Sequence, residues 1–351
     1  VLLVRRAVPL KRPTLKNTNL SRREFVKGTV GTATALATHH QSPLASQNSS
    51  FDSKGLPTRV LGNTGVRLPL IGLGTGSRFC SIADEDQALE ILTHALNQGL
   101  YYWDTAHSYR SGNVISEERL GKISKERRSE IFLATKVDGY NPEEVKKQIE
   151  VSLQRLQTDY IDLIQVHSLK SLGDVDALGK KGGVLDLLRQ MREEGITRHI
   201  GFTGHTSAQV MQNTAEQYDF ETMLIALNHF GGFDRPVPAP ENRQPFEQQS
   251  IPAAAQKGLG VMVMKVIRPR ETVPDLDAAE LIRYALSLKN VTSAVIGIES
   301  LKLLKQNLDH LKHFQSMNAL ELQKIRASLR SFFNHDNLDW MDPDYKDGLW
   351  S

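Results

Sequence analysis

The chain has 351 residues, enough for one large domain or two ordinary ones, each with a substantial core. Its formal charge of +3 comes from residues 1–50, which hold eight Lys and Arg but one acid, so the remainder is mildly acidic and a nucleic-acid partner is not expected. The single cysteine, Cys80, excludes an intramolecular disulfide, a thiolate metal cluster and a CxxC redox pair.

Residues 1–50 have the order of an export leader. Arg22 and Arg23 stand in the string SRREFVK, followed by a weakly apolar run of Gly, Ala and Thr and then a polar stretch without periodicity. This order resembles the twin-arginine export signal of bacteria, and its apolar run is too short to span a membrane. We therefore expect a signal peptide and disordered linker over 1–50, the twin-arginine translocase as a partner and a periplasmic protein. A disordered tail on a cytoplasmic protein and an organelle transit peptide are the alternatives.

From residue 56 the pattern changes to short β-type runs. Residues 59–61 and 66–68 flank a Gly-containing turn, which predicts a hairpin. Eight further strands are predicted at 70–73, 100–103, 130–134, 160–166, 199–202, 223–227, 260–264 and 291–296. Helical patterns lie between or after them at 88–96, 141–156, 184–194, 207–218, 246–256, 276–288 and 300–313.

Alternation of strands and helices over about 245 residues is typical of a (β/α)8 TIM barrel. We expect this barrel over 56–334, with the hairpin covering its floor, an extra C-terminal helix at 319–333 and a tail at 335–351 that folds over the active site. An open doubly wound sheet is the alternative. It is disfavoured because no G-x-G-x-x-G follows the first strand, and the string GLGTG at 72–76 resembles that motif only loosely.

Polar side chains end three consecutive strands of the predicted barrel. Asp104 ends the second strand, Lys136 the third and His167 the fourth, and Tyr109 lies in the loop after Asp104. Each has a plain structural explanation when it stands alone, as a cap, a solvated lysine or a partly buried ring. Because the carboxyl ends of barrel strands meet at one rim, the four together predict a catalytic cluster.

These strings match a known family. WDTAHSY, ATKV, LIQVHS and GFTGH, with the spacing from Gly297 to Asn307, closely resemble the aldo/keto reductase family over about residues 57–313. The GFTGH variant resembles its bacterial branches. The resemblance implies a (β/α)8 barrel that binds a nicotinamide cofactor and reduces an aldehyde or ketone to an alcohol.

The resemblance also assigns roles to the rim residues. It implies that Tyr109 donates the proton, that Lys136 lowers the pKa of Tyr109, that Asp104 holds Lys136 and that His167 orients the carbonyl. The chemistry agrees, because an unperturbed Tyr titrates near pH ~10 and a nearby cation stabilises its phenolate.

The cofactor positions follow from the same resemblance. They are Gly74, Thr75, Thr203, Gly204, Asn228, Lys265, Gly297, Glu299, Ser300 and Asn307. Ser300 is also expected to cap a helix whose N-terminus offers N–H groups to phosphate. Family members that prefer NADPH usually carry Arg or Lys where this chain has Glu299 and Leu303. We expect NADP(H), and NAD(H) stays open.

The predicted substrate wall consists of Trp103, Tyr140, Phe230 and Trp340, which suits a flat or apolar carbonyl compound or a stacked sugar. Plain packing is the alternative for each of them. No metal set is expected, and a hydrolytic barrel enzyme would need paired carboxylates or clustered histidines that the rim lacks. A non-catalytic nicotinamide-binding sensor of the same fold remains the alternative function. The substrate and the oligomeric state are not predicted.

Overall fold

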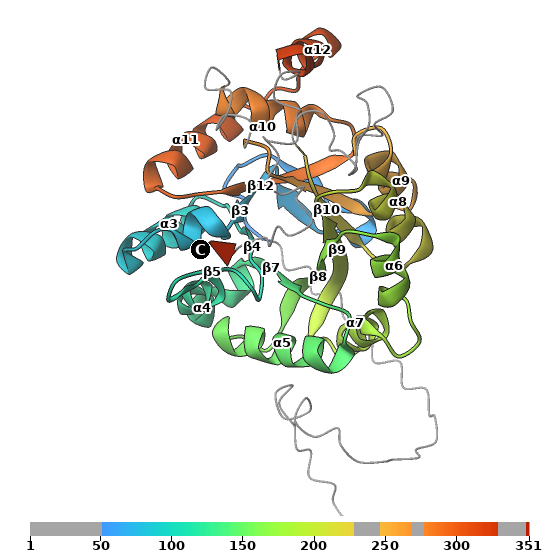
Figure 1. Ribbon diagram of the computed structural model, residues 1–351. Helices are drawn as coiled ribbons and strands as arrows, with labels where there is room; N and C mark the ends of the chain where they lie inside the picture. The colour runs from blue at the N-terminus through green and yellow to red at the C-terminus, as the bar shows by residue number, and fades with distance from the viewer. Residues whose placement is uncertain (1–50, 228–245, 268–276, 329–348, 351) are drawn as a thin grey trace, which may run out of the picture. The chain divides into compact units, whose positions relative to one another are not determined.

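The computed structural model describes residues 51–227, 246–267, 277–328 and 349–350. Eight parallel strands close into a barrel in the order β10, β11, β12, β3, β4, β7, β8, β9 (Figure 1). Their bounds are β3 Ile71–Gly74, β4 Tyr102–Asp104, β7 Phe132–Val137, β8 Ile161–Leu169, β9 Thr197–Gly204, β10 Thr222–Ala226, β11 Gly260–Met264 and β12 Val291–Gly297. Each predicted strand is present, so the predicted (β/α)8 barrel is confirmed.

Helices surround the barrel (Figure 1). The helices that follow the strands are α3 Glu85–Asn97, α4 Ser116–Arg127, α5 Pro142–Arg155, α7 Val184–Glu193, α8 Ala208–Gln217, α9 Ser250–Gln256, α10 Ala278–Ser287 and α11 Leu301–Lys312. Shorter helices are α2 Ser77–Cys80, α6 Leu172–Leu178 and the 3-10 turns η1 Gly62–Thr64 and η2 Arg128–Glu130. The extra helix, α12, spans Ala319–Ser328, and the rest of its predicted range lies outside the described residues.

Helix α4 was absent from the sequence prediction. Its buried face carries Ser116, Glu117, Arg119 and Ser124 beside a single large apolar residue, Leu120. The buried polar groups are paired, for example Glu117 with the Thr135 hydroxyl at 2.7 Å. A helix that buries polar groups has no apolar stripe for periodicity to detect.

The predicted helix ends are largely present. The Asn141 side chain accepts the N–H groups of Glu143 and Glu144 at the start of α5, and Pro142 occupies its first turn. Gly99 follows α3 with φ of +86°, and a Cβ there would lie 2.1 Å from the Ser53 carbonyl oxygen. Glycine therefore ends α3 because no side chain fits.

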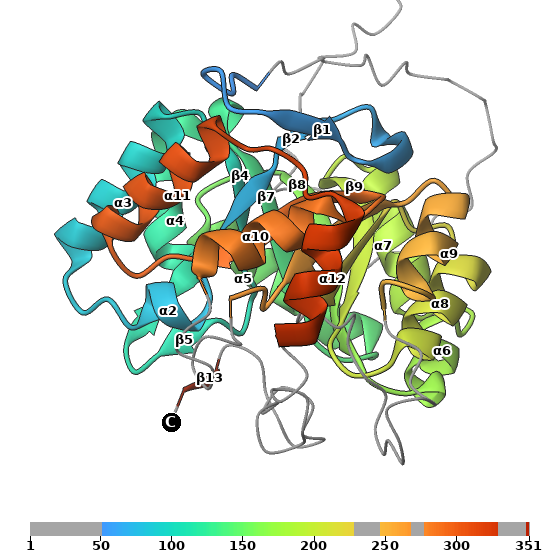
Figure 2. The same ribbon diagram turned by 90° about the horizontal axis from the view of Figure 1, so that it is seen from above.

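The predicted hairpin consists of β1 Thr58–Val60 and β2 Arg67–Pro69, which pair antiparallel. The Arg59 guanidinium donates to the carbonyls of Leu286 and Val291, and the Asn63 N–H donates to the Gly258 carbonyl. These contacts lie at the amino ends of β11 and β12. The hairpin therefore covers the floor of the barrel, away from the carboxyl ends of the strands (Figure 2).

A small sheet lies at the opposite end. Strand β5, Arg110–Ser111, pairs antiparallel with β6, Val114–Ile115, and parallel with β13, Leu349–Trp350. The end of the chain therefore returns to the loop that follows Tyr109 (Figure 2). Among the described residues, no helix is long and apolar enough to cross a membrane.

Candidate active site

Asp104 and Lys136 form a buried ion pair at the carboxyl ends of β4 and β7. Side chains alternate across a strand, so Tyr102 and Asp104 point into the barrel while Trp103 points toward the helices. The Lys136 ammonium donates to an Asp104 carboxylate oxygen and, at 2.7 Å, to the Thr105 carbonyl. Burial raises the pKa of Asp104, and the charge and hydrogen bond of Lys136 oppose that shift.

Gln165 supports this pair and was missed in the sequence. Its amide Nε2 donates to the second Asp104 oxygen at 3.1 Å, and the β7–β8 register places it opposite Lys136. Gln165 precedes His167 by two residues, so both lie on the same face of β8. A polar residue at that spacing inside an apolar strand was the available signal.

Tyr109 lies beside both the ion pair and His167. The Lys136 Nζ is 4.7 Å from the centroid of the Tyr109 ring, and the Tyr109 and His167 ring centroids are 5.8 Å apart in an edge-to-face arrangement. The Tyr109 N–H donates to the Ala106 carbonyl, and its carbonyl accepts from Ser116. The structure thus brings the four predicted catalytic residues together at one rim.

His167 has a partner that the sequence analysis also missed. Its Nδ1 is 2.8 Å from a carboxylate oxygen of Asp138, which directly follows β7. Ser168, the next residue after His167, has φ of +60°, and the pairing of β8 with β9 shifts its register at this point. The backbone is therefore irregular where His167 is presented.

An open pocket adjoins Tyr109 and Asp104. Residues that line it include Gly74, Gly76, Arg78, Tyr109, Lys265 and Gly297. A Cβ on Gly76 would lie 3.2 Å from the Tyr109 ring, and one on Gly74 would lie 3.0 Å from Val295. Side chains at these positions would crowd the pocket wall, so glycine keeps it open. Lys265 has φ of +60°, in the left-handed region.

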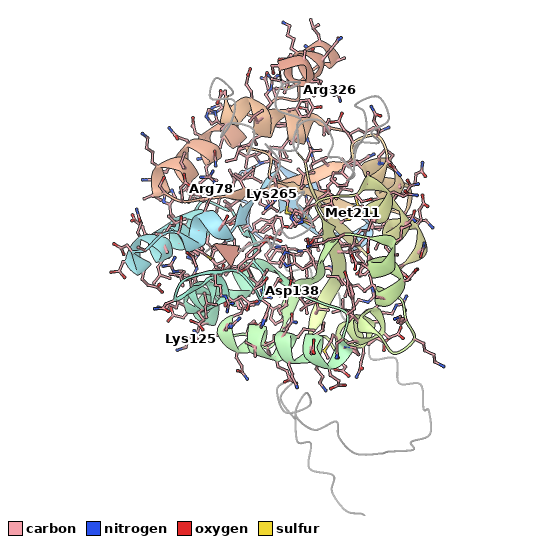
Figure 3. The ribbon with its side chains drawn as sticks, viewed as in Figure 1. Arg78, Lys125, Asp138, Met211, Lys265 and Arg326 are labelled. Atoms are coloured by element: carbon pink, nitrogen blue, oxygen red, sulfur yellow. The ribbon has the colours of Figure 1, made fainter. Side chains whose placement is uncertain are left out.

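Arg78 is a second cation at this pocket and was not predicted. Its guanidinium donates to Glu299 at 2.5 Å, and a Cβ on Gly297 would lie 3.4 Å from the Arg78 side chain. Both partners are about one-third exposed. Arg78 and Lys265 lie on the β3–β12 side of the barrel, whereas Asp138 lies on the side of β7 and α5 (Figure 3). The pocket therefore offers two cations that could meet phosphate groups, with Glu299 already neutralised by one of them.

Some predicted cofactor residues hold the rim together in this structure. Thr75 is completely buried, and both its N–H and its hydroxyl donate to the Asp104 carbonyl at 2.9 Å. Thr203 is also completely buried, and its hydroxyl accepts the Ser168 N–H at 2.8 Å. Gly204 adjoins Met211, where a Cβ would lie 2.3 Å from sulfur. Direct contact of these three residues with a cofactor stays a prediction.

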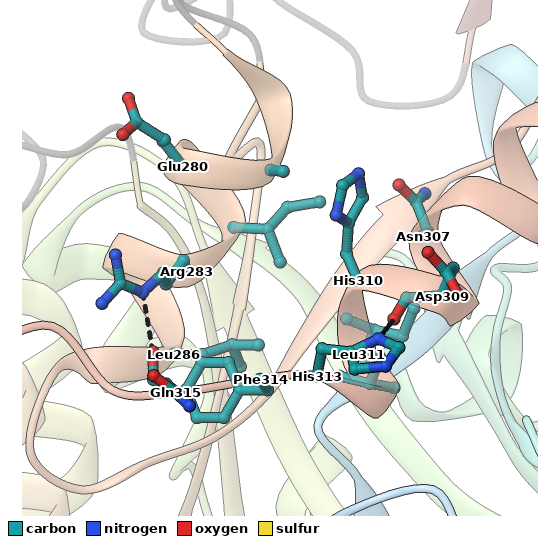
Figure 4. A pocket seen from close by; sticks show the side chains of 13 residues that line it. Glu280, Arg283, Leu286, Asn307, Asp309, His310, Leu311, His313, Phe314 and Gln315 are labelled. Carbon is teal, nitrogen blue, oxygen red and sulfur yellow. Dashed lines mark hydrogen bonds between the residues drawn. The ribbon is translucent and has the colours of Figure 1, made fainter.

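The last helix carries two further predicted positions. Ser300 caps α11, as expected, by accepting the Leu303 N–H at 3.3 Å. Asn307 lies farther along α11 and lines a groove with α10 (Figure 4). That groove has a volume of about 370 Å³ and shares no lining residue with the pocket at Tyr109. A cofactor contact of Asn307 also stays a prediction.

The predicted substrate wall is only partly described. Asn228, predicted for the cofactor, and Phe230 and Trp340, predicted for the substrate, lie outside the described residues. Trp103 is wrongly placed in that wall, because it is completely buried and its indole N–H donates to the Leu100 carbonyl. Tyr140 is half-buried after β7, where burial and Asp174 raise the pKa of its phenol.

Comparisons with known proteins agree with this geometry. The sequence profile of the aldo/keto reductase family matches residues 70–268, more than half of the chain. The chain is 27% identical to L-galactose dehydrogenase of Arabidopsis thaliana over 80% of its own length and 96% of that protein. It is 30% identical to an aldo-keto reductase of Schizosaccharomyces pombe named for NADP(+), over 50% of its own length and 53% of that protein.

A comparison with solved structures finds the same fold. A putative aldo-keto reductase from Pseudomonas aeruginosa matches with a TM-score of 0.60 at 25% identity, covering 75% of this chain and 96% of that one. The residues of the profile match include β3, the buried ion pair, Tyr109 and His167. The chain therefore belongs to the aldo/keto reductase family, whose members carry out NAD(P)H-dependent oxidoreduction of carbonyl compounds.

Proposed function

We propose that this protein reduces an aldehyde or ketone to an alcohol, with Tyr109 as the proton donor. The observation that carries the proposal is the buried Lys136–Asp104 pair directly beside the Tyr109 ring. Burying two charges costs free energy, and apolar residues of similar size would often stabilise a barrel interior equally well. A buried ion pair at this place therefore points to a role in function.

The chain's residues fit a nicotinamide dinucleotide. The pocket beside Tyr109 has glycines where side chains would crowd it and two cations, Arg78 and Lys265, that suit phosphate groups. A bound nicotinamide supplies the hydride that the protein itself lacks. Asp104 and Tyr109 line the same pocket, so the proton donor faces the space in which a substrate would meet the cofactor.

The proton chemistry falls to the rim residues. When hydride adds to a carbonyl carbon, the oxygen takes up the electron pair of the double bond and needs a proton, which Tyr109 supplies. Lys136 stabilises the phenolate that remains, because its ammonium lies 4.7 Å from the ring centroid. Asp104 and Gln165 hold Lys136 in place. We propose that Tyr140, which follows β7, and strand β13, which pairs with β5 after Tyr109, border the substrate.

We propose NADP(H) as the cofactor. Glu299 would repel a 2′-phosphate if it stood alone, but the Arg78 guanidinium pairs with it and offsets its charge. The relative named for NADP(+) points in the same direction. NAD(H) stays the alternative, with Glu299 accepting a hydrogen bond from a ribose hydroxyl.

The test of the reaction is a Tyr109→Phe variant. Turnover of an aldehyde panel that includes benzaldehyde and an aldose should fall by about 10²-fold or more. Binding of NADPH, followed by quenching of tryptophan fluorescence, should not change. A wild-type protein that binds NADPH but oxidises none of it with any carbonyl would favour the sensor function instead.

We also propose that residues 1–50 direct export through the twin-arginine translocase. The support is the string SRREFVK with the weakly apolar run behind it. This route carries folded proteins, so a cofactor bound in the cytoplasm could travel with the protein. An Arg22→Lys/Arg23→Lys variant should remain in the cytoplasm of a bacterial host in which the wild type reaches the periplasm. Export of the variant would refute the twin-arginine route, and a wild type that stays in the cytoplasm would favour a cytoplasmic tail.

A further inference from the structure

Asp138 and His167 form a pair next to the proposed reaction centre. The β7–β8 register sets Lys136 opposite Gln165 and Val137 opposite Val166, which brings Asp138 beside His167. The contact joins His167 Nδ1 to an Asp138 oxygen at 2.8 Å. The His167 side chain is 2% exposed and the Asp138 side chain 44%, so the carboxylate reaches water while most of the ring is shielded from it.

This contact decides which protons His167 can carry. An ionised carboxylate only accepts hydrogen bonds, so Nδ1 must bear a proton at this distance. A neutral imidazole has a single N–H, and with that proton on Nδ1 its Nε2 can only accept. His167 can therefore donate from Nε2 only as an imidazolium.

The surrounding charges favour that cation. Burial alone would raise the pKa of Asp138, but the hydrogen bond and charge of His167 hold that pKa below its usual value. The titratable groups that act on the pair from neighbouring elements are Asp104, Tyr109, His107 and Tyr140. His205 contacts Ser168, the residue after His167. Since Lys136 is paired with Asp104, the Asp138 carboxylate is the charge in contact with the ring.

We propose that Asp138 is a positioning residue for carbonyl reduction, holding His167 as an imidazolium whose Nε2–H donates to the substrate carbonyl. The inference rests on the proposed reductase function. As hydride adds to the carbonyl carbon, the negative charge that builds on the oxygen faces this cation. Tyr109 gives its proton to that oxygen, and His167 keeps both of its own.

The proposal gives His167 a definite pH behaviour. At alkaline pH the ring loses the Nε2 proton, because the hydrogen bond to Asp138 keeps the other proton on Nδ1. Nε2 then presents a lone pair to the carbonyl oxygen, and reduction slows by about tenfold for each further pH unit. Deprotonation of Tyr109 also slows the reaction at alkaline pH. Wild type and any variant that keeps Tyr109 share this effect, so a difference between their pH profiles comes from His167.

The test compares Asp138→Asn with Asp159→Asn. Asp159 is exposed in the turn before β8, at the floor of the barrel, and its replacement removes the same charge. In Asp138→Asn the carboxamide can donate to Nδ1, so a neutral His167 carries its proton on Nε2. We expect about a tenfold lower maximal kcat/KM for NADPH-dependent benzaldehyde reduction and no loss of rate from His167 at alkaline pH. The Asp159→Asn profile should match the wild type.

Nitrogen NMR of His167, assigned with a His167→Asn variant, gives the second readout. The neutral ring should be the Nδ1–H tautomer in the wild type and the Nε2–H tautomer in Asp138→Asn. An Nε2–H tautomer in the wild type, or identical pH profiles for Asp138→Asn and wild type, would overturn the role of Asp138. The NMR readout does not require turnover of a carbonyl. It therefore tests the role of Asp138 even if the proposed reductase function is wrong.

Discussion

Replacing Lys136 with Met should damage both the fold and the reaction. Lys136 is completely buried, and its ammonium is paired with Asp104 and with the Thr105 carbonyl. The substitution keeps an unbranched side chain that is one heavy atom shorter. It leaves the Asp104 carboxylate buried with the Gln165 amide as its remaining side-chain donor among the described residues. Breaking a buried pair from one side typically costs about 3–5 kcal/mol of stability.

The double variant Lys136→Met/Asp104→Asn is the matched control for the charge. It has no buried ion at this site, and the carboxamide oxygen introduced in place of the carboxylate can still accept from Gln165. The double variant should therefore recover at least about half of the stability that Lys136→Met loses. Turnover should stay low in both, by about 10²-fold or more, because neither stabilises the Tyr109 phenolate.

Urea-induced unfolding of the three proteins measures the stability, and the aldehyde panel measures turnover. Equal midpoints for wild type and Lys136→Met would show that the Asp104 carboxylate does not depend on Lys136. Full activity in Lys136→Met would show that proton donation by Tyr109 does not depend on the Lys136 ammonium.

Three smaller predictions concern the surroundings. Arg78→Met should raise the ratio of the KM for NADPH to the KM for NADH by about tenfold, because Glu299 then loses its Arg78 partner. An unchanged ratio would exclude Arg78 from 2′-phosphate recognition. Gln165→Leu should lower stability by about 1.5–3 kcal/mol in thermal unfolding, since Asp104 loses a donor, whereas no change would mean that the bond is unimportant. Hydrogen bonds from Arg189 lower the pKa of Asp219, so Asp219→Asn should cost up to about 1 kcal/mol at neutral pH and nothing in acid, once pH has fallen through the folded-state pKa; an equal cost at both pH values would refute this sign.

The architecture could be predicted because each barrel strand contains a short, largely apolar run and most of the helices carry an apolar stripe. Helix α4 is the exception, because Glu117, Arg119 and two serines occupy its buried positions. Their partners, such as Thr135, lie on other elements, and only the assembled barrel pairs them. Periodicity cannot detect a helix whose buried face is polar.

The meeting of Asp104, Lys136 and His167 could be predicted because strand ends meet at one rim, but the residues that contact them could not. The register between β7 and β8 brings Gln165 and Asp138 to their partners. The sequence of a single strand does not show that register. Arg78 lies on the four-residue helix α2, and its partner Glu299 is 221 residues away. The alternation along β4 that turns Asp104 into the barrel turns Trp103 toward the helices, which a prediction from strand ends alone does not include.

The most direct test of the central claim follows the hydride itself. Wild-type protein is given an aldehyde and NADPH that carries deuterium at the transferable position of the nicotinamide, and the alcohol is analysed by mass spectrometry. The account predicts one deuterium on the carbinol carbon of the product, and a loss of product of about 10²-fold or more in Tyr109→Phe. An unlabelled alcohol, or equal product from Tyr109→Phe, would contradict it.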